Sequence, residues 1–154
     1  MFRTPLALFR TLAIAEAVSW TLLIAGLIIR ATADAPIAVT IGGAIHGFVF
    51  LSYGATAIIV AKNQRWSAGA AILAIGSAVI PYATIPTELW LHRTSRLSGE
   101  WRRTETADPR DARWHDRLLR MLLNHPWAFG IAMFVLVVLA YVVLLNAGPP
   151  GGRS

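Results

Sequence analysis

The 154-residue sequence has no cysteine, which excludes disulfide bonds, a thiolate nucleophile and cysteine-ligated metal sites. Charged residues are also scarce, at 14% of the chain against about 25% in an average soluble domain. Hydrophobic residues make up 56% of the chain, and the mean hydropathy is +0.57. These values exclude a soluble single-domain enzyme and a disordered chain. They predict an integral membrane protein.

Four stretches are long and apolar enough to cross a hydrocarbon core of about 30 Å, which requires about 20 helical residues. They are Leu12–Ile29, Ile37–Ala61, Ser67–Leu91 and Trp127–Leu145. The first is expected to be a retained helix and not a cleaved signal peptide, because it is longer than the usual apolar region of about 7–15 residues. Short connections predict that the first three helices pack as antiparallel neighbours. The predicted fold class is therefore all-α, a bundle of four transmembrane helices.

Eight of the 14 basic residues lie in one polar segment, Leu91–Pro126. Within it, Asp108-Pro109 is typical of a helix start. The arginines that follow recur at a spacing that places them on one helical face: Arg110, Arg113, Arg117 and Arg120. We expect an amphipathic helix in the membrane interface whose arginines bind lipid phosphates, with the soluble half of a longer fourth helix as the alternative. The net charge of +6 is assigned to lipid and topology and not to nucleic acid.

Three motifs occur in a suggestive order along the first three predicted helices. Glu16-Ala17-Val18-Ser19-Trp20 fits an E-x-x-S-aromatic pattern, and Gly43-Ala44-Ile45-His46-Gly47 fits G-x-x-H-G. Pro81 and then Glu88 follow in the third helix. Over roughly residues 2–93 the chain resembles a family of uncharacterised bacterial integral membrane proteins with a His-Gly pair, the domain of unknown function 3817. The resemblance implies a three-helix core and a bacterial inner-membrane location, but no reaction.

Two ionisable side chains, Glu16 and His46, lie deep inside predicted spans, where such groups are costly and are functional candidates. Counted from the turn between the first two helices, they lie about 25 and 20 Å deep at about 1.5 Å per residue. They therefore share one level, and the third helix reaches it near Pro81. We expect Pro81 and Pro86 to kink the third helix and to free two backbone carbonyl groups. The predicted buried polar cluster contains Glu16, Ser19, His46, Ser77 and Tyr82.

The cluster has a structural and a functional interpretation. A direct Glu16–His46 hydrogen bond would fix the register of two helices. Alternatively, a glutamate–histidine pair in a low dielectric is an adjustable proton site. A metal site is a weaker hypothesis, because Glu88-x3-His92 offers only two ligands on one helical face. We interpret Glu88 as an interfacial residue facing water, and no metal or cofactor is expected.

The sequence divides into four parts. Residues 1–93 form the three-helix core, 94–126 the arginine-rich loop and interfacial helix, 127–146 the fourth span, and 147–154 a disordered tail. Gly43 and Gly47 are expected to allow close helix packing, within one monomer or in a dimer. With four spans, both termini lie opposite the arginine-rich segment. The larger basic count then predicts that segment in the cytoplasm and both termini outside.

The leading hypothesis is a small multi-pass plasma-membrane protein without catalytic activity. It would act as a subunit or scaffold that packs against itself or a larger membrane complex. The alternative is a small oligomeric proton-coupled transporter or channel that uses Glu16 and His46. A membrane-embedded enzyme ranks third, because the sequence contains no complete catalytic set.

Overall fold

The computed structural model describes residues 3–147, and within this range the chain forms helices and no strand. The predicted all-α class is confirmed. The helices are α1 (Pro5–Ala33), α2 (Pro36–Asn63), α3 (Ala68–Gly76), η1 (Ser77–Val79), α4 (Thr84–Arg93), η2 (Pro109–Ala112), α5 (Trp114–Asn124) and α6 (Pro126–Ala147). Apart from residue 147, the expected disordered tail lies outside the described residues.

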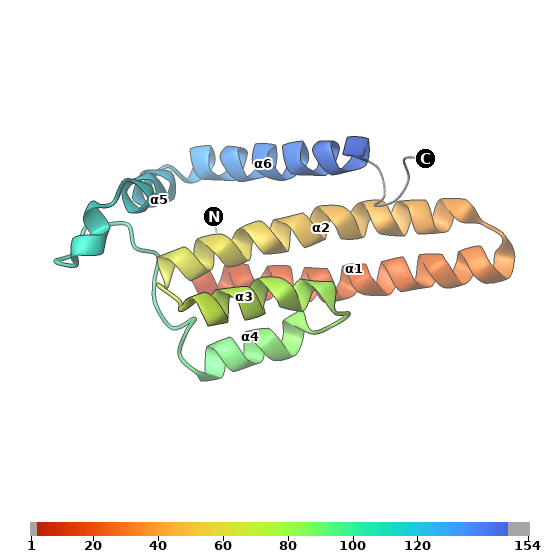
Figure 1. The fold of residues 1–154 in the computed structure, drawn as a ribbon, viewed down its shortest axis with the longest axis horizontal. Coiled ribbons are helices and arrows are strands. Elements are labelled where there is room, and N and C mark those ends of the chain that lie inside the picture. The colour runs from red at the N-terminus through yellow and green to blue at the C-terminus, as the bar shows by residue number, and fades with distance from the viewer. Residues whose placement is uncertain (1–2, 148–154) are drawn as a thin grey trace.

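Helices α1 and α2 form a long antiparallel hairpin (Figure 1). The Thr4 hydroxyl caps α1 by accepting a hydrogen bond from the Ala7 amide at 3.1 Å, and Pro5 occupies the first helical position. At the other end Asp34 adopts a left-handed conformation, with φ of 48°, and Pro36 begins α2. Capping residues and prolines therefore set both ends of this hairpin.

The closest approach of α1 and α2 involves two glycines. A methyl group on Gly42 would stand 2.8 Å from the carbonyl oxygen of Leu22, and one on Gly26 would stand 2.7 Å from that of Ala38. Because these neighbours are backbone atoms of a packed helix, they cannot move aside without separating the helices. Only glycine fits at either position.

The two glycines singled out in the sequence lie beside this contact. A methyl group on Gly43 would meet only the Leu23 side chain, at 3.9 Å. One on Gly47 would meet the ring of Tyr141 in α6, at 3.2 Å. Gly47 therefore faces another helix of the same chain, and the glycine of this part of α2 that contacts the α1 backbone is Gly42, one residue before Gly43.

The expected third span does not cross the bundle. After α3 and η1 the chain turns at residues 80–83, and α4 runs back toward the end where α3 began (Figure 1). Trp66, just before α3, donates its indole N–H to the carbonyl oxygen of Arg96, just after α4, at 2.7 Å. The Arg96 guanidinium carbon also lies 4.6 Å from the centre of the Trp90 ring. Residues 67–93 therefore form a re-entrant hairpin whose two ends lie side by side.

The prediction of four spans is accordingly wrong. Among the described residues, three helices are long and apolar enough to cross a membrane, namely α1, α2 and residues 126–144 of α6. The re-entrant hairpin contributes only shorter helices.

The prolines of the re-entrant hairpin reverse the chain where the sequence predicted a kink. Pro81 cannot continue the hydrogen bonding of the preceding helix, and Tyr82 adopts a φ of 64°. Pro86 lies in the first turn of α4, where its missing amide hydrogen is not needed. The two carbonyl groups expected to be free are both bonded. The Ser77 carbonyl oxygen accepts a hydrogen bond from the Ile80 amide at 3.3 Å. The Tyr82 carbonyl oxygen accepts one from the Ile85 amide at 3.2 Å.

The tip of the re-entrant hairpin, residues 80–83, lies near the middle of the predicted membrane. The Tyr82 hydroxyl is 3.3 Å from the hydroxyl of Thr21, and Trp20 donates its indole N–H to the Ala78 carbonyl at 3.2 Å. Thr21 follows Arg10 by eleven residues, or about 16 Å of helix, which is about half of a 30 Å hydrocarbon core. The side chain of Arg10 forms an ion pair with Glu88 of α4 at 2.9 Å.

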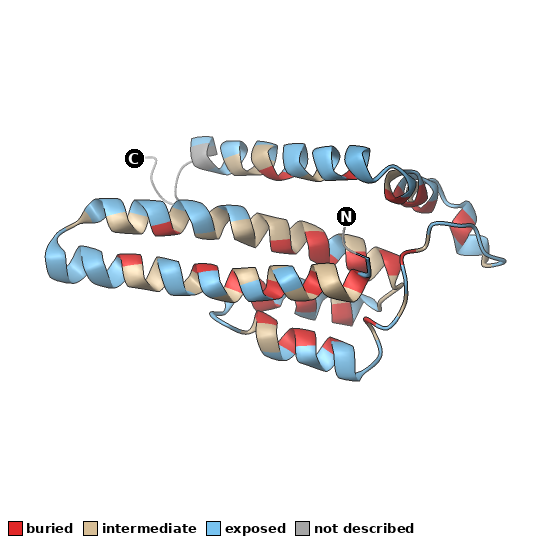
Figure 2. Cartoon of the chain, turned by 180° about the vertical axis from the view of Figure 1, so that it is seen from behind, coloured by how far each residue is buried: buried red, intermediate tan, exposed pale blue. Residues whose placement is uncertain are grey.

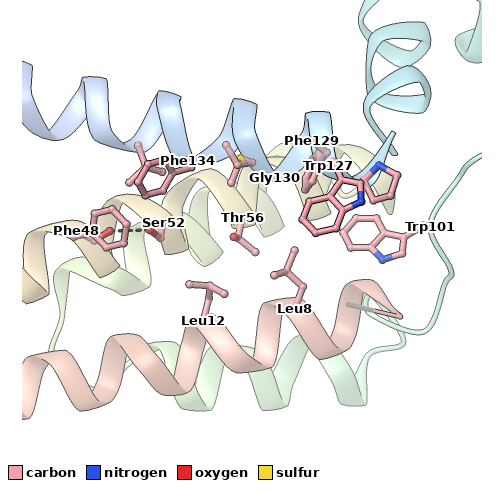
Figure 3. A pocket seen from close by; sticks show the side chains of 13 residues that line it. Leu8, Leu12, Phe48, Ser52, Thr56, Trp101, Trp127, Phe129, Gly130 and Phe134 are labelled. Atoms are coloured by element: carbon pink, nitrogen blue, oxygen red, sulfur yellow. Dashed lines mark hydrogen bonds between the residues drawn. The ribbon is translucent and has the colours of Figure 1, made fainter. Parts of the chain in front are cut away.

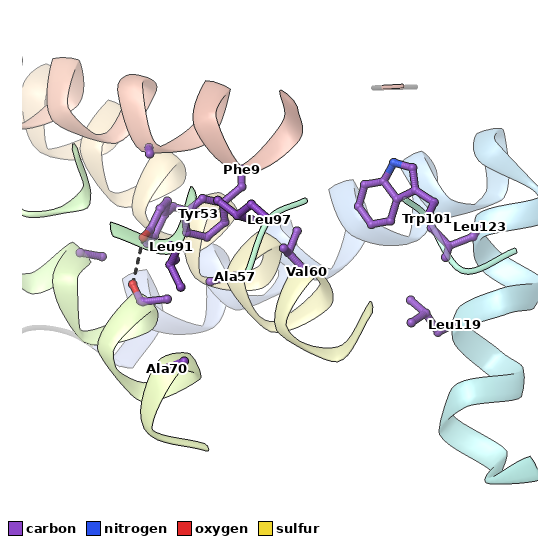
Figure 4. Close-up of a cluster of buried hydrophobic side chains, with 13 residues drawn as sticks. Phe9, Tyr53, Ala57, Val60, Ala70, Leu91, Leu97, Trp101, Leu119 and Leu123 are labelled. Carbon is purple, nitrogen blue, oxygen red and sulfur yellow. Dashed lines mark hydrogen bonds between the residues drawn. The ribbon is translucent and has the colours of Figure 1, made fainter. Parts of the chain in front are cut away.

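The apolar core is concentrated at the end of the bundle that carries the re-entrant hairpin. Phe9, Tyr53, Ala57 and Leu91 are fully buried there (Figure 4). The far halves of α1 and α2 carry mostly exposed residues (Figure 2). Those faces are apolar, as expected of helices that contact lipid.

Nearly all basic residues gather at this same end. Because the re-entrant hairpin does not cross, α1 begins at the end where the Leu91–Pro126 segment lies, and α6 runs away from that end (Figure 1). Of the 14 lysine and arginine residues, all but Arg30 and Arg153 belong to this basic end, and Arg153 lies outside the described residues. The expected placement of both termini opposite the arginine segment is therefore wrong for the start of α1.

Candidate functional site

A fully buried glutamate, Glu16, lies on α1 near the tip of the re-entrant hairpin. It continues a buried stripe at helical spacing that includes Phe9, Ala13 and Ser19. Neither carboxylate oxygen of Glu16 has a hydrogen-bond partner among the described residues. Burying a carboxyl group without a partner is costly, and native proteins seldom retain one without a reason. Glu16 is therefore the centre of the candidate site.

His46 lies at the same level, as the helix-rise calculation predicts, but the direct hydrogen bond to Glu16 is not formed. The His46 Nδ1 atom is 3.9 Å from the Glu16 Oε1 atom and 2.9 Å from the Ser19 hydroxyl oxygen. That hydroxyl donates to the Glu16 backbone carbonyl at 2.8 Å. With its hydrogen used in this way, the Ser19 oxygen accepts from Nδ1–H of His46. The ring of Trp20 lies against the imidazole, with 4.3 Å between their centres.

The other two predicted members of the cluster, Ser77 and Tyr82, have different partners. The Ser77 hydroxyl is 3.1 Å from that of Tyr53, and both contact the Ala74 carbonyl oxygen. Tyr82 is 45% exposed at the hairpin tip, and its hydroxyl reaches Thr21 outside the buried cluster. The structure thus brings Glu16, Ser19 and His46 together, keeps Ser77 in an adjoining buried pair, and leaves Tyr82 outside.

Sequence reasoning missed two buried polar residues of this region, Tyr53 and Thr84. Tyr53 is fully buried in α2, and Thr84 donates its hydroxyl hydrogen to the Ala13 carbonyl at 3.0 Å. Tyr53 falls seven residues after His46, two helical turns along α2, a spacing that could have identified it. Thr84 gave no signal, because its position depends on the chain reversal.

The acidic and histidine residues do not assemble into a metal site. No group of three or more histidine, aspartate or glutamate side chains with suitable geometry occurs within residues 3–147. Glu88, predicted to face water, is instead buried and paired with Arg10 of α1. That ion pair ties the returning helix α4 to the start of α1, which a continuous third span would not permit.

A second polar cluster lies outside the membrane-spanning segments, around Asp111. This side chain is 1% exposed and forms ion pairs with Arg65, with Arg102 at 2.8 Å and with Arg120 at 3.6 Å. Hydrogen bonds from the Thr106 side chain and amide, followed by the Arg65 guanidinium, hold the pKa of Asp111 well below its usual range. Asp111 therefore joins the end of α2 to the arginine-rich segment.

Asp116 makes a parallel connection from α5. It pairs with Lys62 at 2.9 Å and with Arg102 at 3.0 Å. Burial would raise the pKa of its carboxyl group, but the hydrogen bonds and charges of these two partners outweigh burial and lower the pKa. The arginine-rich segment is thus fixed to the bundle by charge pairs.

This network changes the predicted set of lipid-contacting arginines. Arg120 is 9% exposed, and its guanidinium donates to the Asp111 carbonyl oxygen at 2.8 Å. It therefore faces inward and is not available to a lipid headgroup. Arg110, Arg113 and Arg117 are exposed, and Arg110 pairs with Asp108. Asp108-Pro109 starts the short 3-10 helix η2, and the α-helix α5 begins later than the sequence predicted, at Trp114.

Comparison with known proteins identifies the family of this chain. Residues 6–93 match the model of the domain of unknown function DUF3817, and the chain belongs to this family. The match covers α1, α2 and the re-entrant hairpin, including Glu16 and the His46-Gly47 pair.

One curated relative is a Streptomyces coelicolor protein whose name describes it as a membrane protein. It is 36% identical over 103 residues, which are 66% of this chain and 12% of the relative. The matched segment is therefore a small part of a much longer protein. No solved structure matches the chain. Together with the three apolar helices, these findings make the chain a membrane protein.

Proposed function

We propose that this protein is a non-catalytic, multi-pass subunit of the bacterial plasma membrane that packs the tip of its re-entrant hairpin against another membrane protein. The observation that carries this proposal is a chain reversal with exposed residues, 80–83, which lies at the level of Thr21, about halfway along α1. Ile80 is 61% exposed with an extended backbone, and Tyr82 is 45% exposed with a positive φ.

Hydrogen bonds within the turn satisfy part of its backbone, but lipid offers no partner for any polar group that they leave over. Irregular backbone persists at membrane depth only where protein buries it or where it lines a water-filled cavity. Within this chain the tip contacts α1 on one side and is open on the other. A second polypeptide, or a second copy, that covers residues 80–83 would satisfy this requirement.

The relationship to the longer Streptomyces protein supports the same interpretation. A unit that matches 12% of a long membrane protein occurs there beside other segments of the same chain. We expect the unit in this protein to make a corresponding contact with another membrane segment.

The alternative function is a small oligomeric transporter or channel in which the tip lines a water-filled cavity. It is favoured by the unpartnered carboxylate of Glu16 and by His46, whose side chain is 13% exposed at the same level. Water reaching the tip would also approach these two groups, which could then exchange protons.

Crosslinking in native membranes tests the proposal. A photoreactive amino acid at Ile80 should form a protein adduct of one defined mass. A matched probe at Leu139, which is 60% exposed but lies on the regular helix α6, should label lipid. An adduct of twice the chain mass identifies a second copy, and a heavier one identifies a partner.

The same position separates the alternatives. In the otherwise cysteine-free chain, rapid reaction of Ile80→Cys with a small water-soluble thiol reagent would favour the water-filled cavity. Lipid adducts alone from Ile80 would contradict both functions.

A further inference from the structure

A groove on the opposite side of the bundle is independent of the re-entrant hairpin. It has a volume of about 560 Å³ and lies between α1, α2 and α6 at the basic end. Leu8 and Leu12 of α1 point across it toward α6, and Phe48, Phe134 and Trp127 line its other sides (Figure 3). Helix α6 packs along α2 but not closely along α1, which leaves the groove open between them.

The lining of this groove suits an apolar occupant better than ordered water. An apolar cavity of about 150 Å³ is already large enough to bind benzene, and the groove is several times larger. Water needs about two to four polar partners, but few are present. The Ser52 hydroxyl already donates to the Phe48 carbonyl at 2.8 Å, and Thr56 is 2% exposed. An apolar occupant would restore the dispersion contacts that the lining side chains otherwise lack.

The mouth of the groove lies at the basic end, and an arginine that forms no ion pair among the described residues, Arg103, is two residues from the lining residue Trp101. Trp127 lies at the beginning of α6, and with Trp101 of the preceding loop it is typical of the level of the membrane interface. The Asn124 side chain donates to the Arg103 carbonyl at 3.0 Å, which holds Arg103 beside the start of α6. Arg103 is exposed, and it forms none of the ion pairs found within residues 3–147. A ligand with an apolar chain and a negative headgroup matches both parts of the site.

We propose that this groove is a specific binding site for an anionic phospholipid. One acyl chain lies between α1 and α6, and the phosphate faces Arg103. The chain fills the apolar space, and the headgroup pairs with the free guanidinium. The site differs from the exposed arginines of α5, because it selects a whole lipid molecule and not only a charged surface.

Native mass spectrometry of the full chain, extracted from membranes with a mild detergent, tests the site. The wild-type protein should retain one anionic phospholipid, such as phosphatidylglycerol. Gly130→Leu should reduce its occupancy about tenfold, because the new side chain enters the groove and meets no protein atom within 4 Å at its Cβ position. Gly69→Leu is the matched control, because its position on α3 is equally open and lies outside the groove.

Charge variants test the headgroup contact separately. Arg103→Gln should shift the retained lipid toward zwitterionic headgroups, whereas Arg117→Gln, on the exposed face of α5, should not. If Gly130→Leu does not fold, Met133→Trp is the substitute variant, because it adds side-chain volume to the same groove.

Three results would overturn the proposal. The first is that the protein retains each lipid in proportion to its abundance in the membrane. The second is that Gly130→Leu and Gly69→Leu retain equal amounts of the anionic phospholipid. The third is a lipid-free dimer that Gly130→Leu dissociates, which would mean that a second copy fills the groove.

Discussion

At the scale of single residues, the site depends on a hydrogen bond that crosses between two helices. Ser19 of α1 lies between Glu16 and His46, so the imidazole is held by a hydroxyl and not by the carboxylate. Helix rise alone predicts the shared level of these three residues, since each occupies a regular helix that runs from a known turn. It cannot predict which side chain stands between the other two, because this depends on the rotation of each helix about its axis.

We expect Ser19→Ala and His46→Ala to be non-additive. Each variant removes the same 2.9 Å hydrogen bond, so the double variant should lose little more stability than one of the single variants. The coupling energy should be about 0.6 kcal/mol, the average measured between membrane helices, and at most about 1.7 kcal/mol. Denaturation of the four proteins in detergent measures it. The Glu16→Gln and His46→Ala pair should couple more weakly, and additive losses for Ser19 and His46 would contradict the assigned contact.

Asp111 should make stability depend on pH in the acidic range. Its pKa is lowered in the folded protein by hydrogen bonds from Thr106 and by the Arg65 guanidinium. A lowered pKa means that its contribution to the free energy of unfolding is complete above its ordinary value of about 4 and is lost as pH falls toward the folded value. Unfolding midpoints measured from about pH 6 down to about pH 2 should therefore decline, and less steeply in Asp111→Asn.

The control for this experiment is Asp34→Asn. Asp34 is exposed in the turn at the opposite end of the bundle, and its variant should follow the wild-type pH profile. Identical profiles for wild type and Asp111→Asn would show that this network does not stabilise the fold.

At the scale of elements, the contact between α1 and α2 tolerates glycine alone at two positions. Gly42→Ala should destabilise the protein by about 1–3 kcal/mol, because its methyl group would overlap the Leu22 backbone. Gly54→Ala, on the same helix with no atom within 4 Å, should be neutral or stabilising by up to about 1 kcal/mol. Thermal unfolding in detergent compares the two, and equal effects would mean that the helices are not in contact at Gly42.

The re-entrant hairpin is the element that the sequence pattern did not predict. A stretch of 25 residues with two prolines fits a kinked span and a chain reversal equally well, because Pro81 breaks the helix in both. One signal distinguishes them. The part before the turn, Ala68–Val79, is almost entirely apolar, whereas Thr84–Arg93 contains threonine, glutamate, histidine and arginine. A second helix that becomes polar toward its end is typical of a segment that returns to the membrane interface.

At the scale of the whole molecule, the re-entrant hairpin changes the predicted topology. With three spans, the start of α1 and the arginine-rich segment share one end, and that end carries nearly all basic residues. The charge before α1 and the larger charge before α6 then favour the same orientation. The positive-inside rule predicts that this end is cytoplasmic and that α6 ends outside.

Cysteine labelling checks this orientation in a chain that has no cysteine of its own. In intact cells an impermeant thiol reagent should modify Asp34→Cys, whereas Ser98→Cys should react only after permeabilisation. Four spans would place both positions on one side, so labelling of both or of neither in intact cells would support that arrangement. Labelling of Ser98→Cys alone would mean that the orientation is the reverse of the one predicted.

The turn between α1 and α2 has a consequence for the electrical work of membrane insertion. In the predicted orientation it is the one connection among the described residues that crosses the membrane, and its charges, Arg30 and Asp34, cancel. Each uncompensated charge moved across 100 mV would require about 2.3 kcal/mol. Because the two charges of this turn cancel, the membrane potential neither opposes nor assists the insertion of α1 and α2. In the predicted orientation the eight arginines of Leu91–Pro126 remain in the cytoplasm and do not cross.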